Sequence, residues 1–380
     1  MSTTSITLFL VGDVMLGRGV DQILKYSCDP VLYEGSGIDA NGYVKLAVKE
    51  NGPLPPESER GVDYIWGDAI PILEFHKPDF RIINLETSIT VNDKPWPKGI
   101  NYRMHPKNVD IIQAAKIHCC VLSNNHVIDW GYDGLLETMS TLQGANVSYS
   151  GAGSNSLEAE SPTVFNVQGK GRLLVFAGAH HSSGVPDAWK AEVSRPGINI
   201  LDIHNVEKAV SKLKEQVIKF KKEGDVVMLS IHWGGNWGWE IDENHKKFAH
   251  AAIDKAGIDL IHGHSSHHIK GIELYKDKLI IYGCGDFLND YEGITGQGYD
   301  AYRDDLSLMY FPEINPSNGK LVSLFMVPTR IKQMCIHKAK EKEIQWILKT
   351  MDHECGKLGV QVRRVRDELQ LVLRTRQDEL

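Results

Sequence analysis

The sequence has few cysteines and no long apolar run, and each of these absences excludes a class of protein. Only six of its 380 residues are Cys, too few for the disulfide framework of a small secreted domain. No two of them form a C-x-x-C pair, which excludes a zinc clip of that type, and we expect free thiols in a reducing compartment. No segment approaches the ~18 uninterrupted apolar residues of a membrane-spanning helix, so no membrane span is expected.

A targeting signal and an excess of positive charge are also missing. Residues 1–7 are small and polar, without the basic stretch that opens a signal peptide. The apolar run 6–11 stops at Gly12-Asp13, too early for the core of such a peptide. Lysine and arginine number 42 against 49 aspartates and glutamates, a formal net charge of −7, which argues against nucleic acid as the main partner. A cytoplasmic location is the expectation.

Composition and patterning predict an α/β fold. Hydrophobic residues make up 42% and charged residues 24% of the chain, as in ordinary globular proteins. Short apolar runs typical of buried strands recur, each followed by a polar loop, and amphipathic helices are expected at 205–223 and 244–256. Such alternation of strands and helices indicates an α/β sheet protein. Strands are expected at 6–11, 79–83, 119–122, 172–177, 226–231 and 258–261, with a hairpin turn at 276–278.

Two segments depart from this alternation. Residues 28–62 are rich in Gly, Pro and polar side chains and predict a long surface excursion, for which function and disorder both stay open. The part of the chain after about Lys338 is charged, and its pattern predicts helices.

Polar side chains stand at the ends of five predicted strands. In α/β sheets, ligands collect at the carboxyl ends of strands, so these side chains are expected to lie together. They combine carboxylates, amides and imidazoles without thiolate, a set that suits Mn²⁺, Fe, Zn²⁺ or Co²⁺ better than Ca²⁺ or Cu(I). Two such ions about 3.5–4 Å apart form the usual clamp for in-line attack at phosphorus. The residues are Asp13, Asn84, Glu86, Asn125, His126, His232, His264 and His267.

Each of these residues also has a purely structural interpretation. Asp13 after Gly12 could be a turn or helix-cap residue, and Asn124 with Asn125 could satisfy loop backbone through Asx-turns. One histidine at a strand end carries little information in a chain with 16 of them. The histidine-rich stretch 262–268 is harder to explain structurally, and the strand ends taken together favour a metal site.

An ordered set of motifs resembles the CapA family of capsule-synthesis proteins. They are Val11-Gly12-Asp13-Val14-Met15-Leu16-Gly17-Arg18, Asn84-Leu85-Glu86-Thr87-Ser88, Ser123-Asn124-Asn125-His126, Ile231-His232-Trp233-Gly234, 259–273 and 282–289. The resemblance covers roughly residues 6–330. It implies a link to poly-γ-glutamate production and a calcineurin-like metallophosphatase fold, a four-layer α/β/β/α sandwich of two mixed sheets. It also implies one CapA-like domain over 1–330, with 331–380 as a helical extension packed on it.

The resemblance further implies roles for the motif residues. His126 serves the leaving group, and Glu86 takes the place of the bridging carboxylate. Met15 stands where many metallophosphatases have a histidine, and Ser265 replaces an earlier histidine of the fifth motif, for which His264 or His262 stands in. One or two divalent transition-metal ions (Mn, Zn, Fe or Co) are expected. The implied ligands are Asp13, Glu86, Asn125, His232, His264 and His267.

The same residues suggest a mechanism. A metal-held hydroxide would attack a phosphorus or carbonyl centre, and His126 would protonate the departing atom. Asn125 and His126 are neighbours, so on an extended backbone their side chains diverge and one of them faces the metals. Arg18 and Arg103 either hold an anionic substrate or form surface salt bridges. Asn84 and Asn124 are further candidates for substrate binding, and Asp286 and Asn289 for orienting a histidine.

Two functions are compatible with these expectations. The first is a soluble metal-dependent hydrolase related to poly-γ-glutamate biosynthesis, acting on a phosphoester or a γ-glutamyl-type amide. The alternative is a non-catalytic accessory of poly-γ-glutamate assembly that binds an anionic polymer or a partner. The expected ligand is thus an anionic small molecule or a poly-γ-glutamate-like polymer.

Overall fold

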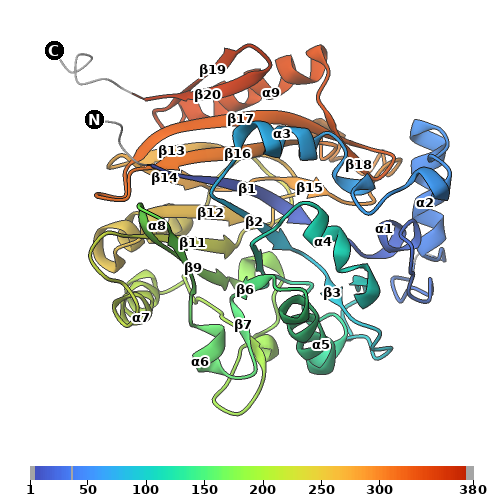
Figure 1. The fold of residues 1–380 in the computed structure, drawn as a ribbon, viewed down its shortest axis with the longest axis horizontal. Helices are drawn as coiled ribbons and strands as arrows, with labels where there is room; N and C mark the ends of the chain where they lie inside the picture. Colours follow the sequence, from blue (N-terminus) through green and yellow to red (C-terminus); the bar gives the residue numbers. More distant parts are fainter. Residues whose placement is uncertain (1–4, 36, 374–380) are drawn as a thin grey trace.

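Two mixed sheets organise the computed structural model, which describes residues 5–35 and 37–373 (Figure 1). The larger sheet has the order β19-β20-β17-β16-β1-β2-β5-β6, with β15 beside β1 and β18 beside β17. Its central strand β1 pairs in parallel with β2 and β15 and antiparallel with β16. The bounds are β1 (Ile6–Val14), β2 (Phe80–Leu85), β5 (Cys119–Val121), β6 (Ser148–Ser150), β15 (Asp286–Leu288), β16 (Leu306–Ile314), β17 (Leu321–Lys332), β18 (Cys335–Lys338), β19 (Gln361–Val365) and β20 (Glu368–Val372).

The smaller sheet has the order β13-β14-β12-β11-β9-β8. Its four inner strands run parallel, and both edge strands are antiparallel to their neighbours. Its bounds are β8 (Thr163–Val167), β9 (Gly171–Ala179), β11 (Asp225–His232), β12 (Leu260–His264), β13 (Ile272–Tyr275) and β14 (Lys278–Ile281). Two short ladders join β3 (Ser88–Ile89) to β4 (Arg103–Met104) and β7 (Ala152–Gly153) to β10 (Gly197–Ile198).

The two sheets share an apolar core, and alternation along the strands builds it. Leu8 and Leu10 of β1 lie in this shared core with Val175 of β9 and Met228 of β11, whereas Phe9 between them belongs to a core on the other face. A period of two is what a strand buried on both faces produces. The predicted α/β class is confirmed, with mixed rather than purely parallel sheets.

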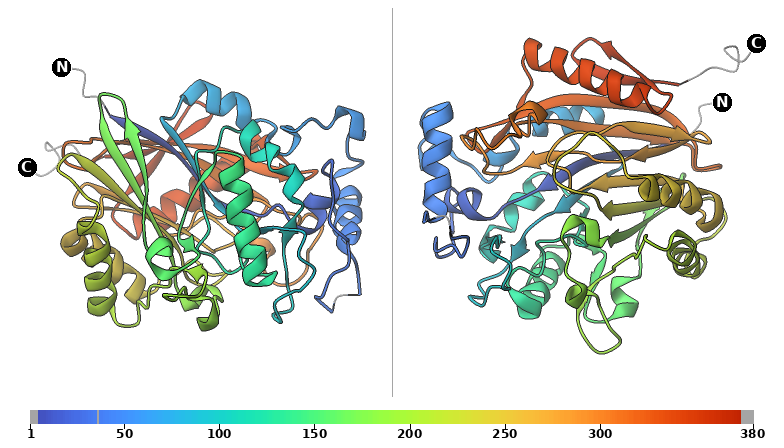
Figure 2. Two further views of the ribbon diagram at one scale, coloured as in Figure 1. Left: turned by 60° about the horizontal axis from the view of Figure 1, so that its bottom comes forward. Right: turned by 180° about the vertical axis from the view of Figure 1, so that it is seen from behind.

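Helices pack on the outer faces of both sheets (Figure 2). α3, α4 and α5 contribute to the core beside the larger sheet, and α7 and α8 to the core beside the smaller one. α9 adds Ile344 and Ile347 to the core between the sheets. The bounds are α1 (Arg18–Gln22), α2 (Ala40–Asn51), α3 (Ala69–His76), α4 (Asp110–Ala114), α5 (Gly131–Gly144), α6 (Ser156–Ala159), α7 (Val206–Ile218), α8 (Glu243–Ala256) and α9 (Glu341–Gly356).

The two predicted amphipathic helices are present as α7 and α8. Asn205 caps α7 by accepting a hydrogen bond from the backbone N–H of Lys208, and Asp242 accepts one from Asn244 at the start of α8. α8 ends at Ala256, and the left-handed backbone of Gly257 after it suits a residue without a side chain. α7 ends at Ile218, earlier than the predicted end at 223, and a turn leads into β11.

Two segments contain structure that the sequence pattern conceals. Within 28–62, α2 begins after Asp39, whose side chain accepts from the backbone N–H of Gly42. The C-terminal extension is not purely helical as expected, because β18, β19 and β20 accompany α9. β20 pairs with β17 through Phe325 and Met326 and so extends the larger sheet. Residues 374–380 of the predicted extension lie outside the described residues.

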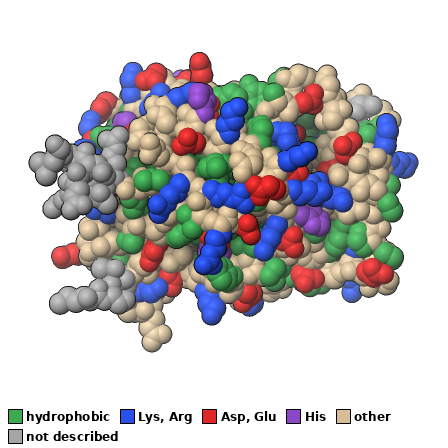
Figure 3. All heavy atoms as spheres, turned by 90° about the horizontal axis from the view of Figure 1, so that it is seen from above, with side chains coloured by type: hydrophobic (Ala, Val, Ile, Leu, Met, Phe, Trp, Pro, Cys, Tyr) green, Lys and Arg blue, Asp and Glu red, His purple; other side chains and the backbone are tan. Residues whose placement is uncertain are grey.

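The cysteines agree with the expectation of free thiols. All six cysteines are free and buried; Cys119 faces the core between the sheets and Cys120 the core on the other face. No described helix combines the length and apolarity needed to cross a membrane. The face seen from above in Figure 1 carries basic and acidic side chains interspersed (Figure 3).

Candidate metal centre

The carboxyl ends of strands from both sheets meet at one place. Asp13 near the end of β1 is in register with Asn84 of β2 and with Asp286 of β15. In the smaller sheet, His232 at the end of β11 is in register with His264 at the end of β12. β1 and β2, like β11 and β12, run parallel to each other, so the residues at their carboxyl ends project at the same edge. Asp286 opens β15 and reaches this edge through its pairing with Asp13. The register thus brings together residues that are far apart in the sequence.

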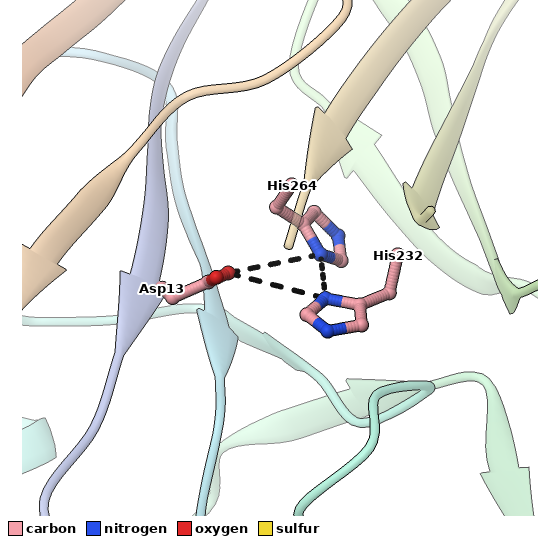
Figure 4. A group of neighbouring side chains, drawn as sticks. All are labelled: Asp13, His232 and His264. Atoms are coloured by element: carbon pink, nitrogen blue, oxygen red, sulfur yellow. Dashed lines mark hydrogen bonds and ion pairs between the residues drawn. The ribbon is translucent and has the colours of Figure 1, made fainter. Parts of the chain in front are cut away.

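Asp13, His232 and His264 form the first group of possible ligands (Figure 4). Asp13 Oδ1 lies 4.0 Å from His232 Nδ1 and 3.9 Å from His264 Nδ1, and the two Nδ1 atoms are 2.7 Å apart. All three side chains are buried. Asp13 Oδ2 is also buried and has no hydrogen-bond partner in the described part of the chain. A buried oxygen without a partner is costly unless a cation occupies its vicinity.

Asp13 belongs to a second group as well, with His267 and Asp286. Within each group the ligand atoms lie within 4.8 Å of one another. His267 Nδ1 is 2.9 Å from Asp286 Oδ1, and Asn289 Nδ2 donates to Asp286 Oδ2 at 2.8 Å. Asp286 therefore orients His267 in the way predicted for it and is a possible ligand itself.

Glu86 and Asn125 lie on the opposite edge of the His232 ring. Glu86 Oε1 is 3.7 Å from His232 Nε2, and Asn125 Oδ1 is 3.0 Å from the same atom. Beyond the effect of burial, the charge of Asp13 also acts on Glu86 and raises the pKa of its carboxyl. Each of the six predicted ligands thus has a possible ligand atom within 4.8 Å of another member of the set, while the ligand role of each stays a prediction.

The electrostatics of the cluster fit a divalent cation. Burial raises the pKa of Asp13 to about 7, and the charge of Asp286 adds to this rise. Burial and the charge of Asp13 raise the pKa of Glu86 well above its usual range. Burial lowers the pKa of His232 and of His264 well below the ordinary value. Neutral imidazoles and carboxylates that lack a compensating charge are the donor set that a transition-metal ion requires.

Asn84 and Asn124 are fully buried beside this cluster. Asn84 Nδ2 donates to Asp13 Oδ1 at 2.7 Å, and Asn124 Nδ2 donates to Asn84 Oδ1 at 3.1 Å. The Asn124 side-chain oxygen accepts from the backbone N–H groups of His126 and Val127, the loop role proposed as its alternative. Both amides orient Asp13 and the loop in this structure.

His126 is held by residues that the sequence analysis did not single out. Its Nδ1 is 2.6 Å from Asp129 Oδ2, and Asp129 Oδ1 is 2.7 Å from Lys98 Nζ. The ring of Tyr102 stacks on the imidazole at 4.0 Å between centroids. The other ring nitrogen, Nε2, lies 4.0 Å from Glu86 Oε1. Burial lowers the pKa of His126 to about 4, although the charge of Asp129 opposes this.

Arg18 and Arg103 bind the protein itself. Arg18 is buried, contacts Asp290 Oδ2 through Nε at 3.1 Å, and lies 3.8 Å above the ring of Tyr43. Arg18 thus forms ion pairs, one of its two predicted alternatives, but in the interior. The Arg103 guanidinium lies 3.9 Å over the Trp130 ring and donates to backbone carbonyls.

A family match covers most of the chain and all of these residues. A family described as bacterial capsule synthesis protein PGA_cap matches residues 7–291. The chain belongs to this family. A protein of Mycobacterium tuberculosis named "Probable polyglutamine synthesis accessory protein" is 41% identical over 359 residues, 94% of this chain and 93% of the relative.

Two further relatives of the capsule synthesis family carry the CapA name. The capsule biosynthesis protein CapA of Bacillus anthracis is 26% identical over 333 residues, 86% of this chain and 68% of the relative. The PGA biosynthesis protein CapA of Bacillus subtilis is 26% identical over 302 residues, 79% of this chain and 66% of the relative. The predicted resemblance to CapA proteins is confirmed.

Proposed function

We propose that this capsule synthesis family member is a metal-dependent hydrolase that acts on a phosphoester or a γ-glutamyl-type amide in polyglutamate-related biosynthesis. The observation that carries this proposal is the position of Asp13, which two groups of possible ligands share. Two mixed sheets with helices on their outer faces also support a metallophosphatase-like sandwich. A cytoplasmic location and an anionic substrate or polymer belong to the same proposal.

The chain's own residues would divide the work. Asp13, His232 and His264 would hold one ion, and Asp13, His267 and Asp286 a second. Such ions would polarise the substrate and lower the pKa of a bound water toward about 7. Asp129 accepts the Nδ1 proton of neutral His126, so its Nε2 is free to take up a proton and later return it to the departing atom. Asn84 orients Asp13 through its amide.

The experiment tests turnover and metal together. Protein stripped with a chelator and reconstituted with Mn²⁺ or Zn²⁺ is assayed on a generic phosphodiester and on a γ-glutamyl anilide. We expect turnover that requires the ion and that Asp13→Asn abolishes. Full metal loading without turnover on either substrate class would overturn the hydrolase proposal.

The name of the mycobacterial relative favours a second candidate, a non-catalytic accessory. In that case the metal centre would serve to bind an anionic polymer or a partner. Binding of poly-γ-glutamate to metal-loaded protein, measured by calorimetry, would support this function if turnover is absent. Loss of polymer binding in Asp13→Asn would show that the polymer binds at the metal centre.

A further inference from the structure

We infer that Ser230 and His262 are positioning residues that determine which ring nitrogen of His264 faces the metal centre. The inference rests on the proposed metal site and concerns residues that lie behind it. Ser230 of β11 and His262 of β12 are in register across the smaller sheet. Both are completely buried, as is His264, so bulk water does not substitute for the contacts among them.

The proton arrangement starts at a backbone carbonyl. His262 Nε2 is 2.7 Å from the carbonyl oxygen of Val11. A carbonyl only accepts, so His262 Nε2 must carry a hydrogen. The other contact of this ring is a hydroxyl, and an imidazolium buried without a carboxylate partner would be costly. His262 is therefore neutral, and its Nδ1 accepts.

The serine hydroxyl determines which nitrogen of His264 carries a hydrogen. Ser230 Oγ is 2.9 Å from His262 Nδ1 and 2.9 Å from His264 Nε2. A hydroxyl has one hydrogen, which Ser230 donates to His262 Nδ1. Its oxygen then accepts at the other contact, so His264 Nε2 must be the donor.

The result is a lone pair on His264 Nδ1. This atom is 3.9 Å from Asp13 Oδ1 and 2.7 Å from His232 Nδ1, on the side of the ring where the first ligand group lies. Rotating the ring by half a turn would replace both nitrogen contacts by carbon, so the contacts also fix its orientation. A metal ligand must present an unprotonated nitrogen while its other N–H is held by an acceptor. Val11, His262 and Ser230 impose that state before any ion arrives.

Matched variants separate this role from simple packing. His262→Gln retains a donor at one end of the side chain and an acceptor at the other, whereas His262→Leu removes both. Ser230→Ala removes the hydroxyl, and Ser230→Thr retains it. Ser307→Ala is the control for loss of a buried strand hydroxyl, since Ser307 Oγ has no partner among the described residues.

Two readouts are needed. The first is the ¹⁵N spectrum of histidine-labelled, metal-free protein, with the His264 signals assigned by their absence in His264→Gln. We expect wild-type His264 to show a protonated Nε2 and a bare Nδ1, and Ser230→Ala to show a mixture of the two tautomers.

The second readout is Zn²⁺ affinity measured against a competing chelator. We expect about 10–100-fold weaker binding in Ser230→Ala and His262→Leu, the usual cost of losing such a partner, and near wild-type binding in Ser230→Thr, His262→Gln and Ser307→Ala.

The outcomes distinguish this inference from the proposed function. A protonated Nδ1 on His264 in the wild-type protein would overturn the inference, as would unchanged Zn²⁺ affinity in folded Ser230→Ala and His262→Leu. Failure of the wild-type protein to bind any ion would overturn the proposed metal site, while the nitrogen spectrum would still report the proton arrangement.

Discussion

The Nδ1 atoms of His232 and His264 lie 2.7 Å apart at the ends of two adjacent parallel strands. His232 Nε2 is 3.0 Å from Asn125 Oδ1, and an amide oxygen only accepts, so neutral His232 carries its hydrogen on Nε2. Its Nδ1 is then bare, like that of His264, and the two lone pairs face each other. Metal ligands must be unprotonated imidazoles, so an ion held by both rings and by Asp13 would relieve the repulsion between these lone pairs.

Metal binding should stabilise the native protein. We expect one or two Mn²⁺ or Zn²⁺ ions per chain after reconstitution and a rise in melting temperature, because an ion bound only by the native state stabilises it by about 2.7 kcal/mol at 100 times Kd. Asp13→Ala should lose both effects. Asp187→Ala, at a side chain that is 94% exposed, is the control. Metal well below one ion per chain together with an unchanged melting temperature would contradict the prediction.

His126 and Glu86 should separate catalysis from metal binding. On any substrate that the wild type hydrolyses, His126→Ala should lower the rate by about 10²–10⁴-fold, the usual cost of a lost acid or base, and retain its metal. Glu86→Ala should lose both, because Glu86 Oε1 lies 3.7 Å from His232 Nε2 and its charge is coupled to that of Asp13. Metal content by elemental analysis and initial rates are measured on the same preparations. If His126→Ala loses its metal as fully as Glu86→Ala, then His126 is a ligand.

Arg18 should matter for stability rather than for substrate affinity. Arg18→Met leaves buried Asp290 without its guanidinium, and breaking a buried pair costs about 3–5 kcal/mol. Urea denaturation should show this loss, and Arg18→Met combined with Asp290→Leu should recover part of it. If Arg18→Met is as stable as the wild type but has a raised KM, Arg18 binds the substrate and this prediction is wrong.

Gly12 should tolerate no side chain. A Cβ added there would lie 1.7 Å from the carbonyl oxygen of Gly285, the same oxygen that accepts from the Asp13 backbone N–H at 3.1 Å. Gly12→Ala should therefore separate β1 from β15 and lower both stability and metal content. Gly144→Ala is the matched control, because no atom lies within 4 Å of its added Cβ and alanine in a helix is expected to stabilise by about 0.4–1 kcal/mol. Equal metal content in the two variants would contradict this account.

Acid should destabilise the protein through buried histidines outside the two ligand groups. Burial lowers the pKa of His180, His245, His262 and His268 to about 4, from an ordinary value of 6.5. Between these values the unfolded chain binds more protons than the native protein, so their contribution to stability falls as pH drops from 6.5 toward 4 and is constant above 7. Urea midpoints of metal-free protein at pH 7, 6 and 5 test this. His245→Gln should reduce the slope, and a slope unaltered in that variant would count against the assignment.

The sequence predicts the strand ends well because local patterns determine them. Asp13, His232 and His264 each follow an apolar run of strand length, and parallel strands must project such residues at one edge. The hydrogen-bonded register that sets His232 opposite His264 is not local, and it follows only from the assembled sheet.

Lys98 and Asp129 could not be found in the same way. Lys98 follows Pro95-Trp96-Pro97 in an irregular segment, and contacts with Asp129 and with the ring of Trp189 position its ammonium group. The one available signal was the spacing of Asp129, three residues after His126. The sequence analysis did not predict the β19–β20 hairpin for a related reason. Its charged sequence is compatible with an exposed helix, and its strand conformation depends on the pairing of β20 with β17.

The pairing of β1 with β15 has a consequence for synthesis on the ribosome. Arg18 and its partner Asp290 are separated by 272 positions in the chain. Asp13 and Asp286 have nearly the same separation in sequence. At roughly 5–20 residues per second, that interval is on the order of half a minute. During it the nascent chain exposes a guanidinium and a carboxylate that the finished protein buries. The second ligand group thus completes only after three quarters of the chain have emerged, so an ion needing both Asp13 and Asp286 binds late in synthesis.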